Sequence, residues 1–132
     1  PNKPTTIPAV NACPLATLNA AAADAVQNVQ LSTGVQSAQT DVPIDSVTTF
    51  NMGQTIYVTF EMATNASGTL AGTICTNGAL AATSIAVPSG QSHRRGEFHL
   101  PSPLAARQTG SGSVTLSWNG AVCAALSFVV TA

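Results

Sequence analysis

The chain has 132 residues, of which only nine are charged: four Lys or Arg and five Asp or Glu. This charged fraction of 7% compares with about 25% in an average soluble domain, and the net charge of −1 argues against nucleic acid or an anionic membrane surface as a partner. No apolar run approaches the roughly 20 residues of a membrane-spanning helix. Polarity comes instead from small side chains, since Ala, Thr and Ser fill 51 positions. Because cytosolic proteins usually stay soluble through Lys and Glu, we expect an extracellular or cell-surface protein.

Residues 1–25 are predicted to form an extended N-terminal arm. Four prolines in its first part, Pro1, Pro4, Pro8 and Pro14, disfavour a helix there. The alanine-rich stretch 15–25 has apolar residues near helical spacing and permits one short helix, with an extended linker as the alternative.

The uncharged centre of the arm is a candidate assembly segment. Such a segment can add a strand to the open sheet edge of a neighbouring subunit, and its prolines would restrict it to an edge position. The alternative is a free leader. The residues that would carry the assembly are Thr5, Thr6, Ile7, Ala9 and Val10.

Residues 26–132 are predicted to form a single all-β domain, an antiparallel sandwich of about seven short strands. The clearest strand is Thr55–Met62, where apolar and polar side chains alternate. Asn-Gly pairs at 77–78 and 119–120 predict two hairpins. One further strand is expected to begin near Val26. The others cover Thr69–Thr76, Leu80–Val87, Gly96–Leu100, Ser113–Trp118 and Ala121–Thr131.

Hydrophobic patterning selects a register for both hairpins. A three-residue loop that ends in a bulged Gly pairs Leu116 with Val122, and the same logic pairs Ile74 with Leu80. A two-residue turn would pair Leu116 with Cys123 and turn Val122 to the opposite face. We prefer the three-residue loop because it keeps the apolar residues on one face.

The three cysteines allow at most one internal disulfide. Cys75 and Cys123 lie in strand-like segments near turns and are the favoured pair, which leaves Cys13 as a spare or intermolecular thiol. The preferred hairpin registers turn Cys75 and Cys123 away from the main core face, which weakens this pairing. The alternatives are a bridge through Cys13, or three small buried thiols. No spacing is typical of a structural zinc site.

The densest polar cluster runs from residue 92 to residue 99. His93, Arg94, Arg95 and Glu97 suit an exposed hairpin tip whose charges discourage edge pairing, or a loop whose arginines bind a carboxylate on a partner. A metal or acid–base site would use His93, Glu97 and His99. No nucleophile elbow is present, no further His exists and acidic residues elsewhere are few, so we expect no catalytic site, no metal and no cofactor.

Two further features concern sugars. Asn65-Ala66-Ser67 matches the acceptor pattern for N-glycosylation. Tyr57 and Trp118 could form part of a sugar-binding platform, although Trp118 suits the core better and aromatic residues make up only 5% of the chain.

Two segments carry a family resemblance. Phe50-Asn51-Met52-Gly53-Gln54-Thr55-Ile56-Tyr57-Val58-Thr59-Phe60 resembles the opening of bacterial and archaeal extracellular immunoglobulin-like modules, and residues 114–130 resemble their last hairpin. The resemblance covers roughly residues 26–132 and implies an immunoglobulin-like β-sandwich that serves as a spacer, adhesive or assembly module. It carries over no functional residues, because such modules share a scaffold rather than a site.

The sequence therefore favours a non-enzymatic structural subunit whose partners are copies of itself. Its arm and apolar surface would join the copies into a filament, a pilus-like fibre or a surface layer. The alternative is a monomeric surface module that recognises a glycan or a protein through its loops at 88–96 and 101–112. A small hydrolase that uses His93 or His99 is a third option.

Overall fold

The computed structural model of the protein describes residues 13–36, 42–76, 79–90, 94–99 and 109–132. Within these residues the chain forms one short helix and eight strands, which confirms the all-β class. The elements are α1 (Ala20–Ala25), β1 (Val26–Ser32), β2 (Thr49–Asn51), β3 (Tyr57–Met62), β4 (Gly68–Thr76), β5 (Ala79–Val87), β6 (Arg95–His99), β7 (Gly110–Trp118) and β8 (Ala121–Thr131). No described helix is both long and apolar enough to cross a membrane.

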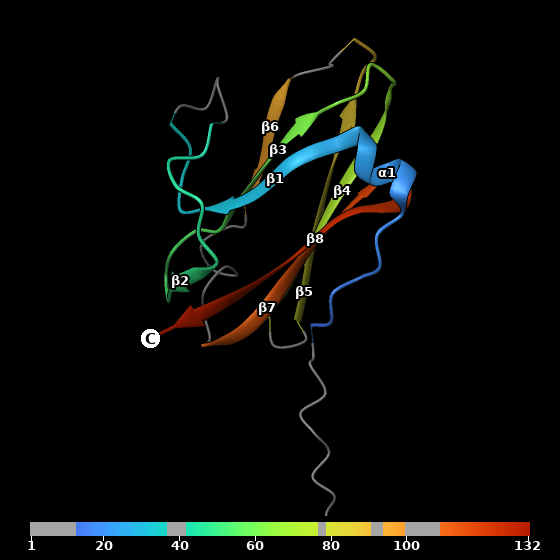
Figure 1. Ribbon diagram of the computed structural model, residues 1–132. Coiled ribbons are helices and arrows are strands. Elements are labelled where there is room, and N and C mark those ends of the chain that lie inside the picture. Colours follow the sequence, from blue (N-terminus) through green and yellow to red (C-terminus); the bar gives the residue numbers. More distant parts are fainter. Residues whose placement is uncertain (1–12, 37–41, 77–78, 91–93, 100–108) are drawn as a thin grey trace, which may run out of the picture.

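The strands form two sheets, one in the order β1-β3-β6 and a larger one in the order β2-β8-β7-β4-β5 (Figure 1). Neighbouring strands are antiparallel except for the short β2, which runs parallel to β8. Both sheets contribute to one hydrophobic core. Its largest fully buried side chains are Phe50, Phe60, Phe128, Leu31, Ile56, Leu70 and Leu116.

The alternation predicted for β3 is confirmed on its apolar face, whereas Thr59 on the opposite face is also buried, at 1% exposed. Ile56, Val58, Phe60 and Met62 are at most 3% exposed. The ring of Phe60 lies over Gly96 on β6, where an added Cβ would come within 2.5 Å of the ring. Gly96 therefore lets β6 and the Phe60 ring approach closely.

Strand β1 contains a bulge that its sequence pattern did not reveal. Gln27 is opposite Glu61 and Gln30 is opposite Thr59, so β1 has one extra residue between these pairs. Asn28 lies in the bulge with a positive φ of 54°, a conformation that Asn tolerates better than most residues. The bulge lets Val26 and Leu31 both face the core although they are five positions apart.

The β7–β8 hairpin has a two-residue turn, so the three-residue loop was wrong. Trp118 pairs with Ala121, and Asn119 and Gly120 both have positive φ, 50° and 87°, as a type I′ turn requires. A bulge at Cys123 then restores the apolar face, because Leu116 pairs with Ala124. The register rule was sound, but the bulge that satisfies it lies in the strand and not in the turn.

The β4–β5 hairpin also differs from the expected register by one residue. Ile74 pairs with Ala81, and Leu80 pairs with Cys75, which leaves Leu80 71% exposed. The expectation failed because it assumed that Leu80 must be buried, whereas β5 lies at the edge of its sheet.

The disulfide joins Cys13 to Cys75, so the favoured Cys75–Cys123 pairing was wrong. Strand β7 separates β4 from β8. Cys75 pairs with Ser113 on β7, and Ser113 pairs with Ser127 on β8. Cys123 lies four positions from Ser127 along β8, so it is not opposite Cys75. Cys123 is a free thiol and 3% exposed.

The segment from Cys13 to α1 is tied to the chain's own large sheet. The disulfide holds its start at the end of β4, and Asn19 N–H donates to Val122 O at 2.8 Å on β8. Asn19 also caps α1 by accepting from Ala22 N at 3.0 Å, and Ala22 joins the core. Residues 13–25 thus pack on the domain, and only residues 1–12, outside the described part, remain as a candidate arm.

Candidate functional site

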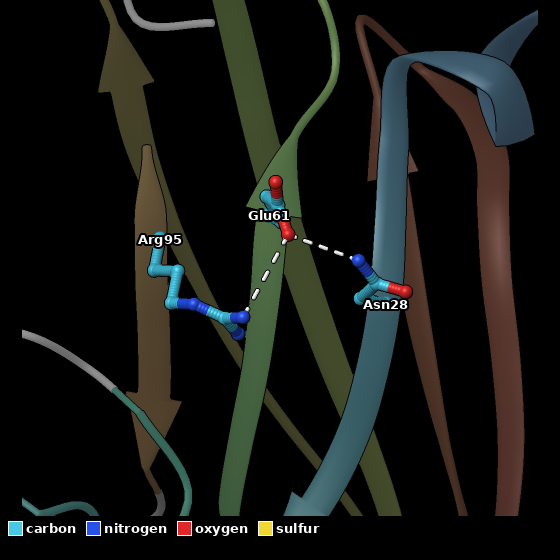
Figure 2. A network of polar contacts seen from close by, with 3 residues as sticks. All are labelled: Asn28, Glu61 and Arg95. Carbon is cyan, nitrogen blue, oxygen red and sulfur yellow. Dashed lines mark hydrogen bonds and ion pairs between the residues drawn. The ribbon is translucent and has the colours of Figure 1, made fainter. Parts of the chain in front are cut away.

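The outer face of the three-stranded sheet carries a small charged cluster (Figure 2). Glu61 on β3 lies between Asn28 on β1 and Arg95 on β6. Asn28 Nδ2 donates to Glu61 Oε2 at 2.9 Å, and Arg95 Nη2 lies 3.9 Å from the same oxygen. One carboxylate therefore links both outer strands of this sheet.

The register explains why these residues meet. Glu61 is opposite Arg95 on one side and Gln27 on the other, and the bulge brings the Asn28 amide to the carboxylate. The Arg95 and Glu61 side chains are 37% and 24% exposed, so their ion pair is worth at most about 1 kcal/mol. The cluster resembles a strand-pairing device or a weak polar contact surface more than a reaction centre.

The predicted metal or acid–base site finds no support among the described residues. No group of three or more His, Cys, Asp or Glu in them could hold a metal ion. Glu97 and His99 are the register partners of Thr59 and Tyr57 on β3, and His93 lies outside the described residues. Arg94 is exposed, and its carbonyl accepts from Met62 N–H at 2.9 Å.

Asp45 forms the densest polar network, and its role is to fasten a loop. Thr33 N–H donates to Asp45 Oδ1 at 2.9 Å, the Thr33 hydroxyl donates to Oδ2 at 2.5 Å, and the Ser32 hydroxyl donates to Oδ1 at 2.7 Å. The hydrogen bond from the Thr33 hydroxyl is the main cause that lowers the pKa of Asp45 below 3.8. These bonds tie the chain after β1 to the approach to β2, which is a structural task.

The residues considered for sugars do not form a common platform. Tyr57 is half-buried on the outer side of the three-stranded sheet. Trp118 is 8% exposed and belongs to the core cluster. Asn65 lies between β3 and β4 on an exposed stretch, where its carbonyl accepts from Gly90 N–H.

The outer face of the five-stranded sheet has the opposite character, because it carries no charged residue on the four strands from β8 to β5. The registers place together Thr69, Ala71, Thr73 and Cys75 of β4, Leu80, Ala82, Ser84 and Ala86 of β5, Ser111, Ser113, Thr115 and Ser117 of β7, and Ala125, Ser127 and Val129 of β8. The charge deficit of the sequence is thus concentrated on one face of the described domain.

The most distinctive feature of this face is its edge strand, β5. It has nine residues, none charged and none proline, and its pairing with β4 has no register shift. Leu80, on the outer face, is 71% exposed, and Ile85, on the opposite face where it pairs with Leu70, is 39% exposed. Within the described residues no strand pairs with its second edge.

The other edges carry the features with which proteins block edge-to-edge pairing. Strand β1 has the bulge at Asn28, β2 is only three residues long, and β6 has five residues that include Arg95 and Glu97. Strand β5 alone among the described edges has none of these. The sequence contained the signal, an uncharged run from Ala79 to Val87, but not the sheet order that makes it an edge.

Comparisons with known proteins give only distant likenesses. No protein-family model and no curated protein matches the chain. Among solved structures, an alkylpurine DNA glycosylase (AlkC) of Pseudomonas fluorescens bound to DNA is similar over 81% of this chain and 30% of its own, with a TM-score of 0.47 and 18% identity. A mutant β-glucosidase of Listeria innocua is similar over 81% of this chain and 16% of its own (TM-score 0.46, 12% identity). A GH3 β-glucosidase of Bifidobacterium adolescentis is similar over 80% and 17% (TM-score 0.41, 12% identity). This chain therefore spans less than a third of each of these proteins.

Proposed function

We propose that this protein is a non-enzymatic, extracellular structural subunit that assembles with copies of itself into a filament, a pilus-like fibre or a surface layer. The observation that carries the proposal is β5, a nine-residue uncharged edge strand with exposed apolar side chains. An open edge of this kind is a template for pairing with another chain. In a monomer it would be an aggregation hazard, whereas in a subunit it is a joining surface.

Three further features support this assignment. The outer face beside β5 has no charge, so covering it with another subunit removes no ion from water. The Cys13–Cys75 disulfide is typical of proteins outside the reducing cytosol. Two sheets over one core suit an immunoglobulin-like sandwich, a scaffold that we propose here serves assembly and not catalysis.

Electron microscopy of native material tests the proposal. We expect regular particles, either fibres or a two-dimensional layer, built from repeated copies of the protein. Native material that contains only single copies would contradict the proposal and would favour a monomeric module that binds a glycan or protein through its loops.

A further inference from the structure

We infer that the strand added to β5 is the segment from Lys3 to Asn11 of a neighbouring copy. This inference rests on the proposed function, because it names the partner of the surface that joins the subunits. It follows from the position of Cys13, from the spacing of the prolines, and from the match in length and charge between the arm of one copy and β5 of the next.

The disulfide determines where the arm leaves the domain. Cys13 is bonded to Cys75, and the register partner of Cys75 on β5 is Leu80. The twelve residues that precede Cys13 in the sequence are therefore attached to the domain beside the hairpin end of the open edge. Nine residues from Lys3 to Asn11 match the nine residues of β5, a length of about 30 Å at 3.4 Å per residue.

The two prolines between Lys3 and Asn11, Pro4 and Pro8, fit one side of a strand. Backbone N–H groups point alternately to the two sides of a strand, and a proline has none to donate. Pro4 and Pro8 are four positions apart, so both can face away from an acceptor edge. Thr5, Ile7 and Ala9 then direct their N–H groups toward it. Because Ile7 precedes a proline, its backbone also favours the extended conformation.

The direction of the chain favours a neighbour's edge over the chain's own. From Cys13 the described segment runs from the end of β4 to Asn19, which bonds Val122 near the start of β8 (Figure 1). To lie along its own β5, the arm would have to extend from Cys13 toward the same end of the sheet as this described segment, so the chain would have to reverse direction next to Cys13. Pairing with another copy requires no reversal.

The resulting contact differs on its two sides, since one copy gives its arm and the other gives β5. Such a heterologous contact repeats from copy to copy and produces a ring if the rotation between copies closes, or an open chain of subunits if it does not. Pairing of β5 with a second β5 would be two-fold symmetric and would end at a dimer. Residues 1–12 contain one charge, at Lys3, and β5 contains none, so the pairing places no charges opposite each other along the strands.

Four single variants of the oxidised 132-residue chain test this inference by sedimentation velocity over a concentration series. Ile7→Pro removes an N–H that should face β5, and Thr6→Pro is its matched control because residue 6 lies on the side of Pro4 and Pro8. Ser84→Lys adds a charge to the exposed outer side of β5. Its matched control, Ser127→Lys, adds the same charge to an exposed position of β8 on the same sheet face.

We expect Ile7→Pro to raise the concentration of half-assembly by up to about tenfold, the effect of losing one good hydrogen bond. Ser84→Lys should raise it as well, because a lysine on an edge strand opposes pairing with another strand. Thr6→Pro and Ser127→Lys should stay within about twofold of the wild type, as surface substitutions usually do. Circular dichroism should show the same fold for Ser84→Lys and Ser127→Lys.

Other patterns overturn the inference. If Ser84→Lys weakens assembly while Ile7→Pro does not, β5 joins the copies through something other than the arm, and the proposed function survives without this inference. If Ile7→Pro and Thr6→Pro have equal effects, the arm does not pair as a strand. If the wild type does not assemble at any concentration, the proposed function fails as well.

Discussion

Loss of the Cys13–Cys75 disulfide should destabilise the folded domain by several kcal/mol. The bridge closes a loop between residues 62 positions apart, and the chain-entropy model assigns a loop of this length about 4 kcal/mol. The double variant Cys13→Ser/Cys75→Ser should therefore have a free energy of unfolding about 4 kcal/mol below that of the oxidised wild type. Its urea midpoint should fall accordingly. Trp118 is the only tryptophan and is 8% exposed, so its fluorescence reports the unfolding.

Cys123 provides the control and a second readout of the same prediction. Burial raises the pKa of the Cys123 thiol to about 11, so the thiol should stay protonated near neutral pH and react with iodoacetamide only in denaturant. The folded state holds the thiol proton more tightly than the unfolded state, whose thiol pKa is near 9.0. The stability linked to this proton is therefore fully present at neutral pH and is lost as the pH rises from about 9 toward about 11. Peptide mapping that finds Cys123 in the disulfide, or a loss below about 1 kcal/mol in the double variant, would refute this account of the bridge.

Two further predictions concern the loop after β1 and the contact between β3 and β6. Asp45→Ala should lower the unfolding free energy by about 1–3 kcal/mol, whereas Asp24→Ala, on the exposed side of α1, should have little effect. The hydrogen bond from Thr33 lowers the pKa of Asp45 below 3.8. The stabilisation by Asp45 should therefore be complete above about pH 4 and disappear as the pH falls through the folded-state pKa. An Asp45→Ala chain that loses as much stability in acid as the wild type would contradict this. Gly96→Ala should cost about 1–3 kcal/mol in thermal or urea unfolding because its Cβ meets the ring of Phe60, and Phe60→Leu should recover part of that loss. An additive double variant would show that the two residues do not clash.

The parts of the fold that sequence could predict are those in which local pattern and burial agree. In β3 the apolar positions alternate without interruption, and Val58, Phe60 and Met62 are all buried as expected. Both Asn-Gly pairs join strands that pair with each other. A resemblance to immunoglobulin-like modules suggested two sheets, but the sequence contained no information on strand order.

The errors came from features that only tertiary structure determines. The register at Leu116 depends on a bulge at Cys123. The residue types around Cys123 do not predict that bulge. The disulfide depends on sheet order, because the chain before α1 lies over β4 while β7 separates Cys75 from Cys123. The exposed edge of β5 depends on the same order, so its uncharged residues looked like an ordinary buried strand.

The sedimentation coefficient of the oxidised, unsubstituted 132-residue chain as a function of concentration tests the central claim most directly. Assembly through the uncharged edge predicts that the coefficient rises continuously with concentration, from that of a 13.3 kDa monomer to species of many copies. A coefficient that stays at the monomer value over the whole range would contradict the claim that β5 joins copies of this protein.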